Sequence, residues 1–146
     1  MGELTLYFDR CFGKRLPKIV ESAKPPFIVK SHFGEKFKDN TPDDESLRIV
    51  GARGWIVLSY DARFHLDTPA LAAIEHFRIG CFYLWGGQMP IWNKLSELTR
   101  AYPKMAARIR GKQKPFIFQV GYHGRIKQVR SWDKKQSVKL AEAAAE

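Results

Sequence analysis

Apolar and polar residues follow one another along the chain in blocks that predict strands and helices in turn. Four short apolar runs have the length and the β-branched and aromatic content of buried strands. They are 4–8, 27–29, 55–59 and 81–85. Between them, apolar residues recur every three or four positions, which is typical of one face of a helix. The segments that we expect to be helical are 12–23, 41–51, 68–80 and 90–110. This alternation predicts an α/β fold with a short parallel sheet flanked by helices.

Two of these helices begin with the same signal. Thr41-Pro42 places an N-cap residue before a proline at the first helical position, and Thr68-Pro69 repeats the pair. Asp43-Asp44-Glu45 follows the first pair, where carboxylates stabilise the positive end of the helix dipole. Pro17 interrupts the pattern of the first helix and predicts either a kink or a shifted start.

The C-terminal part of the chain predicts a β-hairpin and a tail. Residues 116–120 and 125–129 resemble strands, and a glycine-bounded turn separates them. The 146 residues are 45% hydrophobic, which suits one globular domain. We expect residues 1–130 to form this single domain. Residues 131–146 are polar and rich in alanine, and we expect a basic tail that is partly disordered or helical.

The charge of the chain is strongly uneven. The formal net charge is +10, and residues 101–140 carry 11 lysines and arginines but only one acid, Asp133. Such a surface attracts polyanions, because each neutralised phosphate releases counterions. A solubilising basic tail would explain the same composition, so charge alone leaves both interpretations open.

Three further features concern compartment and core. The sequence has no apolar run that could span a bilayer and no basic-then-apolar N-terminal order, so we expect a cytoplasmic protein without a membrane partner. Cys11 and Cys81 form neither a metal-binding pair nor a disulfide framework, and both are predicted to be small apolar fillers. Trp85 and Trp92 are expected in the core rather than in base stacking.

Three aspartates occur at the boundaries of the predicted strands and helices. Asp9 ends the first strand, Asp43 opens a helix, and Asp61 follows the third strand. The carboxyl ends of strands are where open α/β sheets gather their chemistry. Carboxylates that converge there repel one another unless a cation joins them, and hard oxygen ligands favour Mg²⁺ or Mn²⁺. Such an ion beside a basic surface suits phosphodiester hydrolysis.

Three sequence blocks resemble the compact PIN-like domains that are related to VapC toxins. They are Phe8-Asp9-Arg10, Thr41-Pro42-Asp43-Asp44-Glu45 with Leu47, and Gly54 to Asp61. The Ala72-Ala73 helix, the Gly80 to Leu84 strand and the Pro115-Phe116 hairpin are also similar. The resemblance implies a three-layer PIN-like fold and a metal-dependent ribonuclease with Asp9, Asp43 and Asp61 as its catalytic, metal-binding acids.

The chain also departs from the pattern of this family. Cys11 stands where Asn is common, and Ser59 stands where Thr is common but keeps the hydroxyl. Larger PIN domains supply a further acid, usually Glu, before the Asp43 position. Asp44 and Glu45 are our further candidates for metal ligands, and Glu21, Glu35 and Asp39 are weaker ones.

Two hypotheses follow from these features. The first is an endoribonuclease, the toxin of a toxin–antitoxin pair, whose partners are RNA, an antitoxin protein and a second copy of the chain. The alternative is a non-catalytic PIN-derived module that binds nucleic acid through its basic C-terminal region. Cys11 favours the alternative, whereas the three acids in order favour the first. The residues predicted to contact nucleic acid are Arg10, Arg63, His65, Lys112, Lys114, Arg125 and Lys127.

Overall fold

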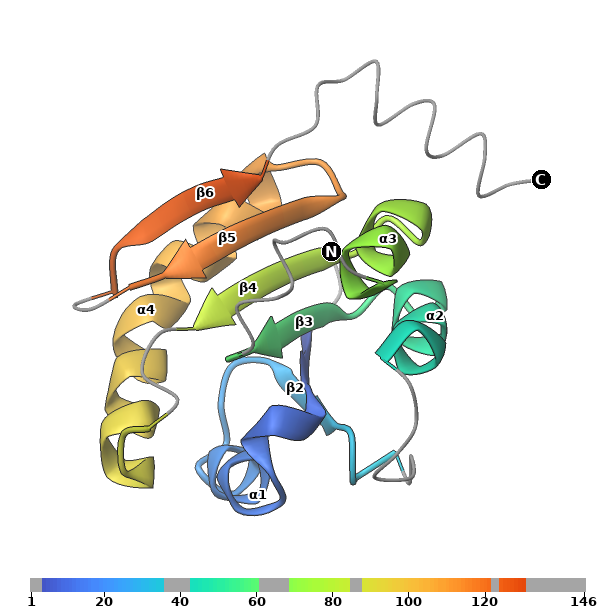
Figure 1. Ribbon diagram of the computed structural model, residues 1–146. Helices are drawn as coiled ribbons and strands as arrows, with labels where there is room; N and C mark the ends of the chain where they lie inside the picture. Colours follow the sequence, from blue (N-terminus) through green and yellow to red (C-terminus); the bar gives the residue numbers. More distant parts are fainter. Residues whose placement is uncertain (1–3, 36–42, 61–68, 85–87, 122–123, 131–146) are drawn as a thin grey trace.

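The computed structural model describes residues 4–35, 43–60, 69–84, 88–121 and 124–130, with only the backbone of Asp43, Asp44 and Arg130. Strands and helices alternate as predicted (Figure 1). The strands are β1 Thr5–Phe8, β2 Ile28–Ser31, β3 Ile56–Ser59, β4 Gly80–Leu84, β5 Phe116–Val120 and β6 Ile126–Arg130. The helices are α1 Arg15–Ser22, α2 Asp43–Ala52, α3 Pro69–His76 and α4 Ile91–Gly111, with a 3₁₀ turn, η1, at Arg10–Phe12.

All six strands belong to one sheet, in the order β2-β1-β3-β4-β5-β6. The first five strands in this order are parallel, and β6 runs antiparallel to β5. The C-terminal hairpin is therefore confirmed. Its first strand is also the fifth parallel strand of the sheet, because Gly80 to Leu84 of β4 pair with Phe116 to Val120 of β5.

Helices cover both faces of the sheet and form three layers, which confirms the predicted α/β architecture. Figure 1 shows α1 and α4 on one side of the sheet and α2 and α3 on the other. Successive residues of a strand point to opposite faces, so Leu6 and Phe8 join the core under α1 and α4. Tyr7 and Val57 join the core under α2 and α3. Burial on both faces explains why the strands are continuous apolar runs.

Some local predictions need correction. Helix α1 begins at Arg15, which places Pro17 in the first turn, where its missing N–H costs little. The prediction that Trp92 lies in the core is wrong, because its side chain is 78% exposed. Trp92 lies about 120° around α4 from the buried Leu98, since each residue turns a helix by about 100°. Trp85 lies outside the described residues.

The parallel topology gives the sheet two distinct edges. Strands β1 to β5 end at one of them, the carboxyl edge, and the crossover helices begin there. The carboxyl edge is therefore the place where the residue after each strand can meet the start of a helix.

Within the described part of the chain, no helix is long and apolar enough to cross a membrane.

Candidate active site

Asp9 is the first residue beyond β1 and lies at the carboxyl edge. Its backbone N–H donates to the carbonyl of Leu58 at 3.2 Å. Its Oδ1 accepts a hydrogen bond from the backbone N–H of Cys11 at 2.8 Å, which makes Asp9 the N-cap of η1. Its Oδ2 accepts a hydrogen bond from the hydroxyl of Ser59 at 2.9 Å. The carboxylate is therefore held by its own turn and by β3.

Ser59 is the last residue of β3 and has no exposed surface. Its position follows from the register, because Phe8 pairs with Leu58 and Ser59 then lies beside Asp9. The hydroxyl also lies 3.7 Å from Cys11 Sγ. A buried hydroxyl must find partners, and here one partner is the carboxylate that the sequence predicts to be catalytic. The hydroxyl that Ser59 shares with Thr thus orients Asp9.

Cys11 links η1 to the end of β3. Its Sγ accepts a hydrogen bond from the backbone N–H of Tyr60 at 3.2 Å, and the Tyr60 ring packs on Phe12 with centroids 4.4 Å apart. Desolvation of the Cys11 Sγ atom is the main cause that raises the pKa of this thiol to about 12, and the negative charge of the Asp9 carboxylate is the next cause. The thiol is therefore neutral at physiological pH. The prediction of an apolar filler is wrong for this exposed residue but correct for Cys81, which is buried in the core.

The second group of predicted acids lies at the start of α2. The helix begins at Asp43. Because α2 crosses between the parallel strands β2 and β3, it runs opposite to them, and its first residues lie at the carboxyl edge. The side chains of Asp43 and Asp44 are outside the described atoms, whereas Glu45 is exposed in the first turn.

The remaining residues predicted beside the acids follow β1 and β3. Arg10 comes directly after Asp9 and is half-buried. Asp61 is the residue after Tyr60 in the sequence, and it lies outside the described residues together with Arg63 and His65. The roles assigned to these residues stay predictions.

The C-terminal basic residues divide between the two edges of the sheet. Arg125 is exposed in the hairpin that begins where β5 ends, at the carboxyl edge, and Lys127 is exposed on β6. Lys112 and Lys114 lie before β5, at the opposite edge from Asp9. The ammonium of Lys114 donates to the carbonyl of Gly54 at 3.1 Å, and burial followed by the charge of Arg78 lowers the pKa of Lys114. The net charge of the C-terminal part of the chain predicted a basic region, but it did not predict that these residues lie at opposite edges of the sheet.

The donor set around Asp9 suits a hard cation. Each carboxylate oxygen accepts one of the two hydrogen bonds described above. Carboxylate oxygens are the ligands that Mg²⁺ and Mn²⁺ prefer. The described residues contain no group of three or more His, Cys, Asp or Glu that could hold a metal ion. The predicted cluster depends on the side chains of Asp43 and Asp61, which are not among them.

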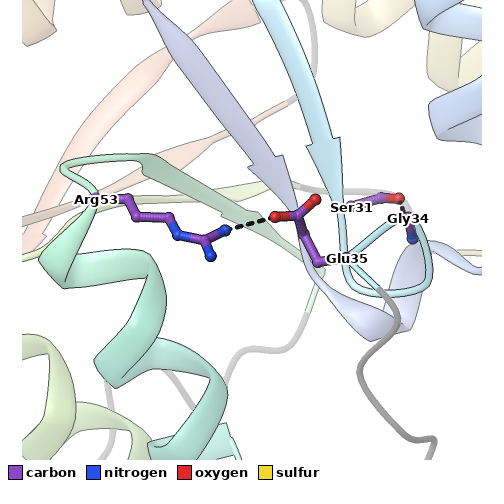
Figure 2. Close-up of polar contacts among 4 residues, drawn as sticks. All are labelled: Ser31, Gly34, Glu35 and Arg53. Carbon is purple, nitrogen blue, oxygen red and sulfur yellow. Dashed lines mark hydrogen bonds and ion pairs between the residues drawn. The ribbon is translucent and has the colours of Figure 1, made fainter.

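Glu35 has a different partner. Figure 2 shows its carboxylate directed at Arg53, just beyond α2, and the two side chains form an ion pair at 2.5 Å. Glu21 is exposed near the end of α1, and Asp39 lies outside the described residues. The ion pair gives Glu35 a structural role in holding the turn after β2.

Comparison with known proteins agrees with the fold. Residues 4–86, more than half of the chain, match the family model of the PIN-like domain. The chain belongs to the PIN-like domain family. The match runs from β1 through β4 and includes the Asp9, Asp43 and Asp61 positions. No curated protein and no solved structure matches the chain. PIN-like domains are in general nucleases, so nuclease is the functional class that this membership suggests.

Proposed function

We propose that the protein is a Mg²⁺- or Mn²⁺-dependent endoribonuclease that hydrolyses RNA phosphodiesters. The observation that carries the proposal is the Asp9 carboxylate, fixed at the carboxyl edge by Ser59 and by the Cys11 N–H. The PIN-like family supports the class of reaction. The family-typical acid is thus retained together with a hydroxyl that orients it.

In this mechanism, Asp9, Asp43 and Asp61 would hold the metal ion, and Asp44 and Glu45 are further ligand candidates. When bound, the ion supplies an activated water and stabilises negative charge on the phosphate. Ser59 keeps the Asp9 carboxylate in one orientation, which matters because misplaced ligands lose metal affinity. The chemistry works through positioning and needs no nucleophilic side chain.

Arg10, Arg63 and His65 are proposed to hold the phosphates that flank the cleaved bond. Arg10 supports this role through its position, because it directly follows Asp9 in the chain and is half-buried. A guanidinium beside a phosphate can form two parallel hydrogen bonds, which fixes the strand as well as neutralising it. Replacing such an arginine with alanine should therefore raise KM for RNA.

The test combines Mn²⁺ calorimetry with cleavage of a structured RNA by the full-length protein. Wild type should bind Mn²⁺ and cleave, whereas Asp9→Asn should lose both properties. Glu75→Gln changes an acid near the end of α3 that belongs to no predicted metal-ligand set, and it serves as the matched control, which should behave as wild type. Asp61→Asn should also abolish cleavage. Identical behaviour of wild type and Asp9→Asn would refute the proposal.

A non-catalytic nucleic-acid-binding module is the second candidate. It is favoured by Cys11, because a weakly polar thiol occupies the position where the family commonly has the polar side chain of Asn. This function predicts RNA binding that weakens with salt and does not change when EDTA is added. Cleavage by wild type that stops in EDTA would reject it.

A role as the toxin of a toxin–antitoxin pair is a separate part of the proposal. Its support is the resemblance to VapC-related domains, and it predicts a small antitoxin-like protein encoded beside this chain. Co-expression of that neighbour should suppress cleavage. If no such neighbour is encoded, the toxin role falls and the nuclease proposal stands.

A further inference from the structure

A nucleotide-sized cavity lies beside the edge strand β2. Its volume is about 530 Å³, within the range of about 300–1,000 Å³ that small-ligand pockets show. Residues of α1, β2 and the turn after β2 line it. They include Lys14, Lys18, Val29, Ser31, Phe33 and Gly34.

The wall of this cavity is bonded to the strand that ends just before Asp9. In the sheet, β1 lies between β2 and β3, so the cavity and Ser59 are on opposite sides of β1. Ser31 pairs with Phe8, and the N–H of His32 donates to the Phe8 carbonyl at 3.0 Å. The turn that forms the cavity wall is thus bonded to the residue that directly precedes Asp9.

The lining combines an aromatic face with ammonium groups. Lys14 Nζ lies 5.4 Å from the centroid of the Phe33 ring. Lys18 follows one turn later on α1 and is exposed. Proteins hold unpaired nucleotides with this combination, because an aromatic ring stacks on the base and cations neutralise the phosphate.

The charge balance of the lining favours an anion. Glu21 and Glu35 also line the cavity, but the Glu35 carboxylate is paired with Arg53. Lys30 is a lining residue as well, although its ammonium lies 5.7 Å from the Trp55 ring centroid. Because a contact with a ring leaves the charge of a lysine in place, three lysines face Glu21, the lining acid that the described ion pairs do not compensate.

The wall that carries Phe33 is fixed before any ligand binds. Figure 2 shows the Gly34 N–H directed at Ser31 Oγ, at 2.9 Å, and Glu35 directed at Arg53. A Cβ added to Gly34 would lie 2.7 Å from Ser31 Oγ, so a larger residue at this position would have to displace the hydroxyl that accepts this hydrogen bond. A preformed wall lowers the entropic cost of binding.

We propose that this cavity binds one nucleotide of a single-stranded RNA segment beside Asp9, with the base on Phe33 and a phosphate on Lys14 and Lys18. The choice of RNA as ligand rests on the proposed function. The cavity would place the neighbouring phosphodiester of the strand toward the Asp9 carboxylate. Binding itself requires no metal and no cleavage.

The experiment measures binding of a short, fluorescein-labelled, mixed-sequence RNA by anisotropy in EDTA. Phe33→Ala should weaken binding roughly 5- to 150-fold, the usual loss for one stacked base. Phe33→Tyr should restore it. Lys14→Ala should make the slope of log K against log salt concentration less negative by about 0.7, because one phosphate contact is lost. Lys14→Arg keeps the charge and should leave the slope unchanged. Trp92→Ala and Lys24→Ala are matched controls, because both residues are exposed and lie outside the cavity and the basic C-terminal region.

The outcomes separate this subsite from the nuclease activity. Equal losses in Phe33→Ala and Trp92→Ala, or in Lys14→Ala and Lys24→Ala, would overturn the subsite. If wild type does not cleave but Phe33→Ala loses binding, the subsite stands and the nuclease proposal falls. If wild type cleaves and Phe33→Ala has an unchanged KM, the subsite falls and the nuclease stands. Lys14 is exposed, so its variants test the subsite even where Phe33→Ala unfolds.

Discussion

The hydroxyl of Ser59 joins the Asp9 carboxylate to β3, and its removal should weaken both folding and metal binding. Ser59 has no exposed surface, and its Oγ lies 2.9 Å from Asp9 Oδ2. Hydrogen bonds to charged groups contribute about 1.5–3 kcal/mol. Ser59→Ala should therefore lower the free energy of unfolding by about 1.5–3 kcal/mol, which is about 2–4 °C in Tm per kcal/mol for a chain of this size.

The same variant should also weaken Mn²⁺ binding. A residue that orients a metal ligand typically contributes 10- to 100-fold in affinity, so we expect a loss of about that size in Ser59→Ala. Ser59→Thr keeps the hydroxyl and should keep the affinity. Urea denaturation gives the free energy of unfolding, and calorimetry gives the affinity for Mn²⁺.

Thr99→Ala is the control for the loss of a hydroxyl. Thr99 Oγ1 donates to the carbonyl of Ser96 at 2.9 Å, but this bond is exposed and its acceptor is neutral. Its removal should cost no more than about 0.5 kcal/mol. In a double-mutant cycle, Ser59→Ala and Asp9→Asn should couple by at least about 1 kcal/mol. If Ser59→Ala matches Thr99→Ala in stability and leaves Mn²⁺ affinity unchanged, the orienting role of Ser59 is wrong.

Two further predictions concern Cys11 and Gly80. Folding raises the pKa of Cys11 from 9.0 to about 12. The folded protein therefore binds this proton more tightly than the unfolded chain, which stabilises the fold fully below about pH 9 and no longer does so as the pH rises toward 12. Urea denaturation between about pH 8 and 11 should therefore show a shallower loss of stability for Cys11→Ser than for wild type, and parallel curves would contradict this assignment. A Cβ on Gly80 would overlap the Phe116 ring, so Gly80→Ala should cost about 1–3 kcal/mol. Gly111→Ala meets no atom within 4 Å and is the control; equal urea midpoints for both variants would exclude the clash.

Hydrophobic periodicity predicted the elements of the fold because each element is buried in a simple way. Ile56 to Leu58 are buried on both faces of β3, so a continuous apolar run was sufficient to identify a strand. Trp92 shows that the spacing of apolar residues identifies the buried face of a helix more reliably than the size of a single apolar side chain. The spacing of Ile91, Leu95 and Leu98 already defined the buried face of α4, and Trp92 lies off that face although it is large and apolar.

The pairing of elements could not be predicted from the same pattern. Period and composition do not state which strands are neighbours, so the parallel pairing of β5 with β4 appeared only in the structure. Asp9 could be predicted as an acid that ends a strand, and Ser59 as a retained hydroxyl. The contact between Cys11 Sγ and the Tyr60 N–H joins residues 49 positions apart, which no local pattern indicates.

The strands on the two sides of β1 contribute to different parts of the proposed function around Asp9. On the β3 side, Ser59 holds the carboxylate, together with the Cys11 N–H from the turn after β1. On the β2 side, the turn bonded to Phe8 presents Phe33 to the cavity. Ser59 and Phe33 share no described hydrogen-bond or ring partner, and independent sites have additive free energies. Ser59→Ala should therefore act on metal affinity and kcat, Phe33→Ala on RNA affinity and KM, and the double variant should show the product of the two effects on kcat/KM.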